Sequence, residues 1–178
     1  MKNIFFWAAI GTLAFAAFAN AVSPYVGQDG RGIKALSQQE VDDYLNGKGL
    51  GYAKAAELNH YPGPRHVLDL SKALALTEEQ TKRTQAIHDV MKERAITLGK
   101  QLVEKEQELD RQFANGSINA ELLNSLLLDI GSLQAKIRYV HLSAHLEQKA
   151  LLTKHQVHQY DQLRGYGNPN GAGRDHSH

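Results

Sequence analysis

The chain of 178 residues contains no cysteine, only two methionines and only four prolines. Without cysteine it has neither disulfide bonds nor thiolate chemistry, so its stability has to come from packing. Met91 is the only methionine besides Met1, which excludes a methionine-rich copper site. The sequence also lacks a glycine-rich phosphate loop and a Gly-x-Ser-x-Gly nucleophile motif. Nothing in it supports enzymatic activity, and we expect none.

The chain also has no marked excess of charge of either sign. The chain has 20 Lys and Arg against 19 Asp and Glu, and Lys2 is the only charged residue within residues 1–21. Removal of that segment therefore leaves a formally neutral chain, and no nucleic-acid partner is expected. Nine histidines are the compositional excess, and imidazole is the commonest side-chain metal ligand.

The N-terminus carries the longest apolar run. It begins Met1-Lys2-Asn3, stays apolar over residues 4–18 and ends with Ala19 and Ala21 at the small positions that a signal peptidase recognises. The run falls short of the ~20 residues that a transmembrane helix needs. We therefore expect residues 1–21 to be a secretory signal peptide, cleaved after Ala21, and no membrane span in the mature chain.

Residues 76–156 carry two apolar stripes of helical spacing, separated by the turn Asn115-Gly116-Ser117. Each arm of roughly 35 residues predicts a helix of about 50 Å. The fold class is therefore all-α, with a long antiparallel helical hairpin. A two-helix layer of this length cannot bury both stripes, so we expect short flanking helices folded over it, a homodimer, or both. The stripes consist of Ile87, Met91, Ala95, Leu98, Leu102, Leu109 and Phe113, followed by Leu123, Leu126, Leu127, Ile130, Leu133, Ile137, Val140 and Ala144.

Capping boxes mark where helices begin. Ser37-Gln38-Gln39-Glu40 predicts a short helix through Leu45, and Pro64 predicts a second one that ends at Leu76. We divide the chain into the signal peptide 1–21, an irregular lead-in with short helices over 22–62, the hairpin domain 63–165 and a disordered, histidine-containing tail 166–178.

Two further capping boxes share the sequence pattern Leu-Thr-x-x-Gln. Leu76-Thr77-Glu78-Glu79-Gln80 precedes the first arm, and Leu152-Thr153-Lys154-His155-Gln156 follows the second. In each box Leu76 or Leu152 serves as the staple, Thr77 or Thr153 as the cap, and Gln80 or Gln156 as the reciprocal acceptor.

The doubled motif at the two ends of a hairpin resembles the LTxxQ family of small periplasmic proteins, which includes Spy and CpxP and the metal-responsive relatives ZraP and CnrX. The likeness covers roughly Pro64 to Gly165. It implies a hooked-hairpin homodimer in the periplasm that acts in envelope stress as an ATP-independent chaperone, with unfolded clients or an envelope-stress regulator as partners. The alternative that it implies is a heavy-metal sensor or resistance protein with histidine ligands.

For a chaperone, the surface to find is a basic helical cradle dotted with apolar residues. The charges that we expect to build it are Arg83, Lys92, Arg94, Lys136 and Arg138. This function requires no cofactor.

For a metal site, His141 and His145 are the first candidates, because a spacing of four residues places both imidazoles on one helical face about 6 Å apart. The plainer interpretation is two boundary histidines that pack against a partner helix. His66 is our choice of third ligand if its helix folds back against the second arm, and His60 is a weaker fourth. Imidazole ligands do not choose among zinc, nickel and copper. We interpret the remaining histidines as packed or solvated side chains or as weak tail ligands: His88, His155, His158, His176 and His178.

Overall fold

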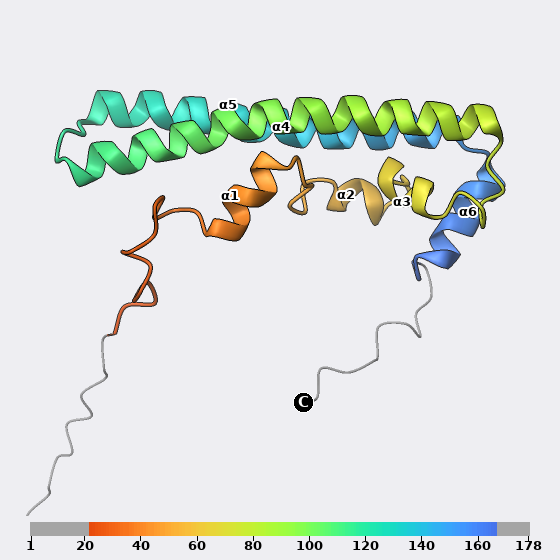
Figure 1. The fold of residues 1–178 in the computed structure, drawn as a ribbon, viewed down its shortest axis with the longest axis horizontal. Helices are drawn as coiled ribbons and strands as arrows, with labels where there is room; N and C mark the ends of the chain where they lie inside the picture. Colours follow the sequence, from red (N-terminus) through yellow and green to blue (C-terminus); the bar gives the residue numbers. More distant parts are fainter. Residues whose placement is uncertain (1–21, 167–178) are drawn as a thin grey trace, which may run out of the picture.

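The computed structural model describes residues 22–166, so the expected signal peptide and residues 167–178 of the expected tail lie outside the described residues. Within this range the chain forms helices and loops without strands, which confirms the all-α prediction. Two long helices, α4 (Glu78–Ala114) and α5 (Ala120–Leu151), pack as the predicted antiparallel hairpin (Figure 1). The turn between them contains Gly116 at φ 64°, a left-handed conformation that glycine adopts without strain.

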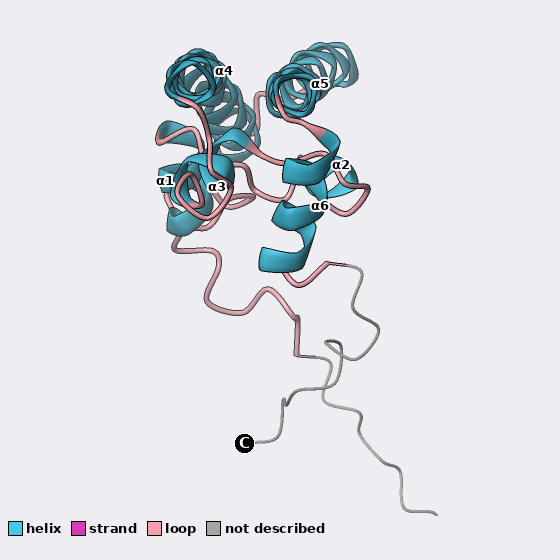
Figure 2. Ribbon diagram, turned by 90° about the vertical axis from the view of Figure 1, so that its right-hand side faces the viewer, coloured by secondary structure: helices cyan, strands magenta, loops and turns pink. Residues whose placement is uncertain are grey.

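Four short helices form a second layer along one face of the hairpin (Figures 1 and 2). They are α1 (Gln38–Leu45), α2 (Lys54–Glu57), α3 (Pro64–Asp69) and α6 (Lys154–Leu163). Helices α1 and α3 contact α4, while α2 and α3 contact α5. The expected flanking helices are thus confirmed. No helix within residues 22–166 is both long and apolar enough to cross a membrane.

The hairpin core lies where α1 and the loop after it cover the two arms. Leu102, Ile130, Leu133 and Ile137 form its buried cluster, and Tyr44 and Tyr52 pack against it from the covering layer. Full burial of such a side chain stabilises the fold by about 1.5–3 kcal/mol. The two tyrosine hydroxyls are 3.1 Å apart, so the polar end of each ring has a hydrogen-bond partner.

The covering layer stops short of the hairpin tip (Figure 1). Phe113 and Leu127, which the stripes assign to the core, are 57% and 50% exposed there. No described residue folds over the tip, so the single chain leaves these two side chains exposed, and their burial by a partner copy stays a prediction.

At the opposite end, the two Leu-Thr-x-x-Gln segments form the predicted capping boxes and face each other. Thr77 and Thr153 are N-caps of α4 and α6, and their boxes are closed by Gln80 and Gln156. The carboxamides of the two glutamines also bond reciprocally, with N···O distances of 2.9 and 3.0 Å. We call this pair the glutamine clasp. A second apolar cluster, Val67, Leu74, Leu152 and Tyr160, packs at this end.

Helix α3 ends at Asp69 and not, as predicted, at Leu76. Beyond it the chain turns, with Ala75 at φ 46° and a hydrogen bond from the Leu76 N–H to the Ser71 carbonyl. The turn leaves the Leu74 carbonyl free to accept from Gln156 at 3.2 Å. The left-handed φ of Ala75 cannot belong to a right-handed helix, so α3 cannot run through to Leu76.

Two glycines test the packing of the covering layer. A Cβ at Gly99 would lie 2.2 Å from the Tyr44 carbonyl oxygen, whereas a Cβ at Gly131 would meet no atom within 4 Å. We expect Gly99→Ala to lower the free energy of unfolding in urea by about 1–3 kcal/mol through overpacking. Gly131→Ala, in the middle of α5, should raise it by about 0.5–1 kcal/mol. Equal stability of the two variants would contradict the close approach of α1 to α4.

Candidate functional site

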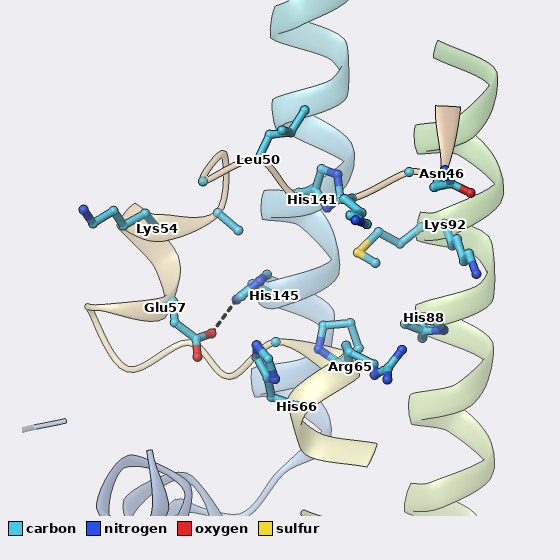
Figure 3. Close-up of a pocket in the computed structure, with 18 of the residues that line it drawn as sticks. Asn46, Leu50, Lys54, Glu57, Arg65, His66, His88, Lys92, His141 and His145 are labelled. Atoms are coloured by element: carbon cyan, nitrogen blue, oxygen red, sulfur yellow. Dashed lines mark ion pairs between the residues drawn. The ribbon is translucent and has the colours of Figure 1, made fainter. Parts of the chain in front are cut away.

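A large space remains between the covering layer and the base half of the hairpin. Its volume is about 620 Å³, within the range of small-molecule sites. Four histidines line it: His66 from α3, His88 from α4, and His141 and His145 from α5 (Figure 3). We call this space the histidine cavity.

His145 is buried and anchored. Its Nδ1 lies 2.7 Å from the carbonyl oxygen of Tyr61, so Nδ1 carries hydrogen and donates to that oxygen. A Cβ at position 63 would lie 2.9 Å from the Cε1 of His145. Gly63 therefore gives the chain between α2 and α3 room to run close against the ring.

His141 is buried one turn earlier on α5. Its Nε2 is inaccessible to solvent and has no hydrogen-bond partner among the described residues. Burial, and then the neighbouring His145, lower the pKa of His141, so the ring is neutral at pH 7. The plainer prediction is that His141 and His145 are boundary histidines packed against a partner helix. Both rings are buried beside the apolar stripe, but they pack against the covering layer of the same chain.

The three predicted metal ligands, His141, His145 and His66, do line one cavity. They are not gathered as a ligand set: within residues 22–166 no three His, Asp or Glu side chains lie close enough together to hold a metal ion. His60, the weaker fourth candidate, lies 2.9 Å from Asp161 and does not line the cavity. The side chains as placed therefore do not fit a metal, and metal binding stays a prediction.

Glu57 is the site residue that the sequence analysis missed. Its Oε1 accepts from the hydroxyls of Tyr160 at 2.5 Å and Tyr166 at 3.0 Å, and lies 3.4 Å from Nε of Arg164. Burial, and then the hydrogen bond to Glu57, raise the pKa of Tyr160, so the hydroxyl keeps its proton and donates. Glu57 thus ties α2 to α6. Its Oε2 is buried without a hydrogen-bond partner in the described chain, 3.7 Å from Nδ1 of His145 (Figure 3).

The uncovered face of the hairpin carries a second hollow between α4 and α5, of about 760 Å³. It continues toward the base as a smaller one of about 210 Å³, and we call the two together the open groove. Its lining includes Ile87, Val90, Arg94, Leu98, Ala135, Lys136, Tyr139 and Val140. Val90 and Tyr139 are 56% and 65% exposed.

The five charges expected for a basic cradle do not gather on one surface. Arg94 and Lys136 line the open groove, together with Glu93. Lys92 lines the histidine cavity, and Arg83 and Arg138 line neither. The groove is therefore apolar with a rim of mixed charge.

Buried His141 makes stability depend on pH. Its pKa lies below the ordinary 6.5, so below that pH the unfolded chain binds more protons than the folded one, and stability falls. We expect a decline from pH 7 to pH 5, with a slope of at most about 1.4 kcal/mol per pH unit for one histidine. Urea unfolding at several pH values measures it.

His141→Phe should flatten this decline, and part of what remains comes from His66, whose pKa burial also lowers. His155→Phe, at an exposed position on α6, is the matched control and should leave the slope unchanged. An unaltered slope in His141→Phe would contradict the neutral, buried ring.

Comparison of the chain with protein-family models, curated proteins and solved structures finds no match. The resemblance to the LTxxQ family therefore rests on the doubled motif, and membership of that family stays a prediction.

Proposed function

We propose that this protein is a periplasmic, ATP-independent chaperone of the Spy/CpxP kind, which holds unfolded clients on the open groove. The observation that carries the proposal is the apolar strip along the uncovered face of the hairpin, where Val90 and Tyr139 are more than half exposed. Exposed apolar patches of this kind on soluble proteins mark interaction sites.

The composition of the groove favours weak binding of varied clients over tight binding of one. Leu98, Ala135 and Val140 supply apolar lining, and Tyr139 adds an aromatic ring with a polar end. Arg94, Lys136 and Glu93 place both charge signs at the rim. Exposed charge pairs contribute little each and are screened by salt, so client contacts should weaken as ionic strength rises.

Export to the periplasm is the part of the proposal that rests on residues 1–21. The charged start, the apolar run and the Ala19-Asn20-Ala21 site support a cleaved signal peptide. The doubled Leu-Thr-x-x-Gln motif supports the same compartment through the family that it resembles.

Self-association is a further part of the proposal, and the hairpin tip supports it. Phe113, Leu127 and Leu128 are all at least half exposed beyond the end of the covering layer. A second copy packed there would bury the ends of both stripes and leave the open groove accessible.

The client-binding role is tested by suppression of aggregation of a chemically unfolded protein. Val90→Glu/Tyr139→Glu places two like charges in the apolar strip, so protection should require about tenfold more protein or more. Leu58→Glu/Leu163→Glu changes two residues of similar exposure, 53% and 48%, away from the groove, and should protect as well as the wild type. Full protection by the groove variant, with an unchanged helical spectrum, would exclude the groove as the client site.

The dimer is tested by sedimentation equilibrium. Phe113→Ser/Leu127→Ser should raise the dissociation constant about tenfold or more, because two exposed apolar side chains leave the interface. Leu58→Ser/Leu163→Ser is the matched control. A wild type that stays monomeric over the measured concentrations, or a tip variant that dimerises as tightly as the wild type, would overturn this part of the proposal.

A further inference from the structure

The histidine cavity lies on the covered face of the hairpin and shares one lining residue, Met91, with the open groove. Most of its charged lining residues are cations. Among the described residues, five cationic side chains line it and a single acidic one, that of Glu57. The cations are Lys48, Lys54, Arg65, Lys92 and Arg164. Low-dielectric walls lined by one sign of charge concentrate ligands of the opposite sign.

Part of this positive charge is uncompensated. Lys48 lies 2.7 Å from Asp43, Arg65 lies 3.1 Å from Asp69, and Arg164 is the cation beside Glu57. Lys54 and Lys92 form no ion pair with a residue of the described chain, although Lys92 contributes, after His88 and Gln85, to the lowered pKa of Asp89. Figure 3 shows the two lysines at opposite sides of the cavity. The cavity wall thus carries two cations without an ion-pair partner within residues 22–166.

The inner wall offers hydrogen-bonding groups without partners. No hydrogen bond joins either ring nitrogen of His141 to a described residue. The Cε1 and Nδ1 atoms of His141 each lie 4.0 Å from where a Cβ would stand at Gly49, so the tautomer with hydrogen on Nδ1 would present a donor toward this loop. In that loop the backbone N–H groups of Gly49, Leu50 and Gly51 donate to no described residue. Successive free N–H groups in a turn favour an anion.

We infer that the histidine cavity binds a small organic anion, whose carboxylate or phosphate group is attracted by Lys54 and Lys92 and hydrogen-bonded by His141 and the Gly49–Gly51 loop. Leu50, Pro64 and Met91 provide apolar lining for the organic part. The volume of about 620 Å³ suits a ligand of this size. The same cations oppose a divalent metal ion, for which the described residues gather no three ligands.

The inference does not depend on the proposed chaperone activity, because the cavity and the groove lie on different faces. Benzoate and phenyl phosphate are suitable probes, since they separate a carboxylate from a phosphate preference on the same ring. Benzyl alcohol, benzylamine and zinc serve as neutral, cationic and metal controls. Titration into the full mature chain, followed by the imidazole proton signals in NMR, reports both affinity and location.

We expect saturable binding of at least one anion with shifts at His141 and His145, and weaker or no binding of the alcohol and the amine. Lys54→Gln/Lys92→Gln should weaken anion binding about threefold to tenfold, as expected for two partly solvated charges. Lys72→Gln/Lys100→Gln removes the same charge at exposed positions outside the cavity, and should leave affinity unchanged.

Several results would overturn the inference. They are the absence of anion binding, equal binding of benzyl alcohol or benzylamine, equal losses in the two lysine pairs, and histidine shifts caused by zinc but by neither anion. The last result would favour the metal site predicted from His141 and His145.

Discussion

The reciprocal hydrogen bonds between Gln80 and Gln156 close the base of the hairpin, and the remaining packing depends on them. Each carboxamide oxygen also accepts from the backbone N–H of its own cap, Thr77 or Thr153. Each nitrogen reaches across to a carbonyl as well, and Gln156 thereby fixes Leu74. Each amide therefore completes its own capping box and also bonds to the other amide. These shared hydrogen bonds hold the start of α4, the start of α6 and the turn after α3 together as one unit.

That closure gives the hairpin two different faces. With the turn after α3 fixed at the base, the lead-in runs back along one face, where Gly99 admits α1 against α4 and Gly63 admits the chain against His145. The histidine cavity is the space that this layer leaves, and the layer brings Lys48, Lys54, Arg65 and the backbone N–H groups of the Gly49–Gly51 loop to it. The other face receives no described segment and keeps its apolar groove. Because only one face of the hairpin is covered, the protein has both a cavity suited to a small anion and a groove suited to apolar segments.

Local signals predicted most of the helices. Capping boxes and the spacing of apolar residues located α1, α4, α5 and α6, because N–H satisfaction and amphipathicity are properties of a few neighbouring residues. Contacts between residues far apart in the sequence could not be predicted in this way. Glu57 gave no signal, since its partners are more than a hundred residues away. The exposure of Phe113 depends on where the covering layer stops, which is not a local property. The capping boxes predict the two glutamines as reciprocal acceptors, but the contact between them exists only once both helices are folded.

A double-mutant cycle on the glutamine clasp tests this account most directly. The free energy of unfolding is measured for the wild type, Gln80→Leu, Gln156→Leu and the double variant. If the amides act as one unit, either single change leaves buried polar groups without partners, and the double change costs less than the sum, with a coupling of about 1–3 kcal/mol. Additive effects, with a coupling below about 0.5 kcal/mol, would show that the two capping boxes act independently and that the base is closed by other contacts.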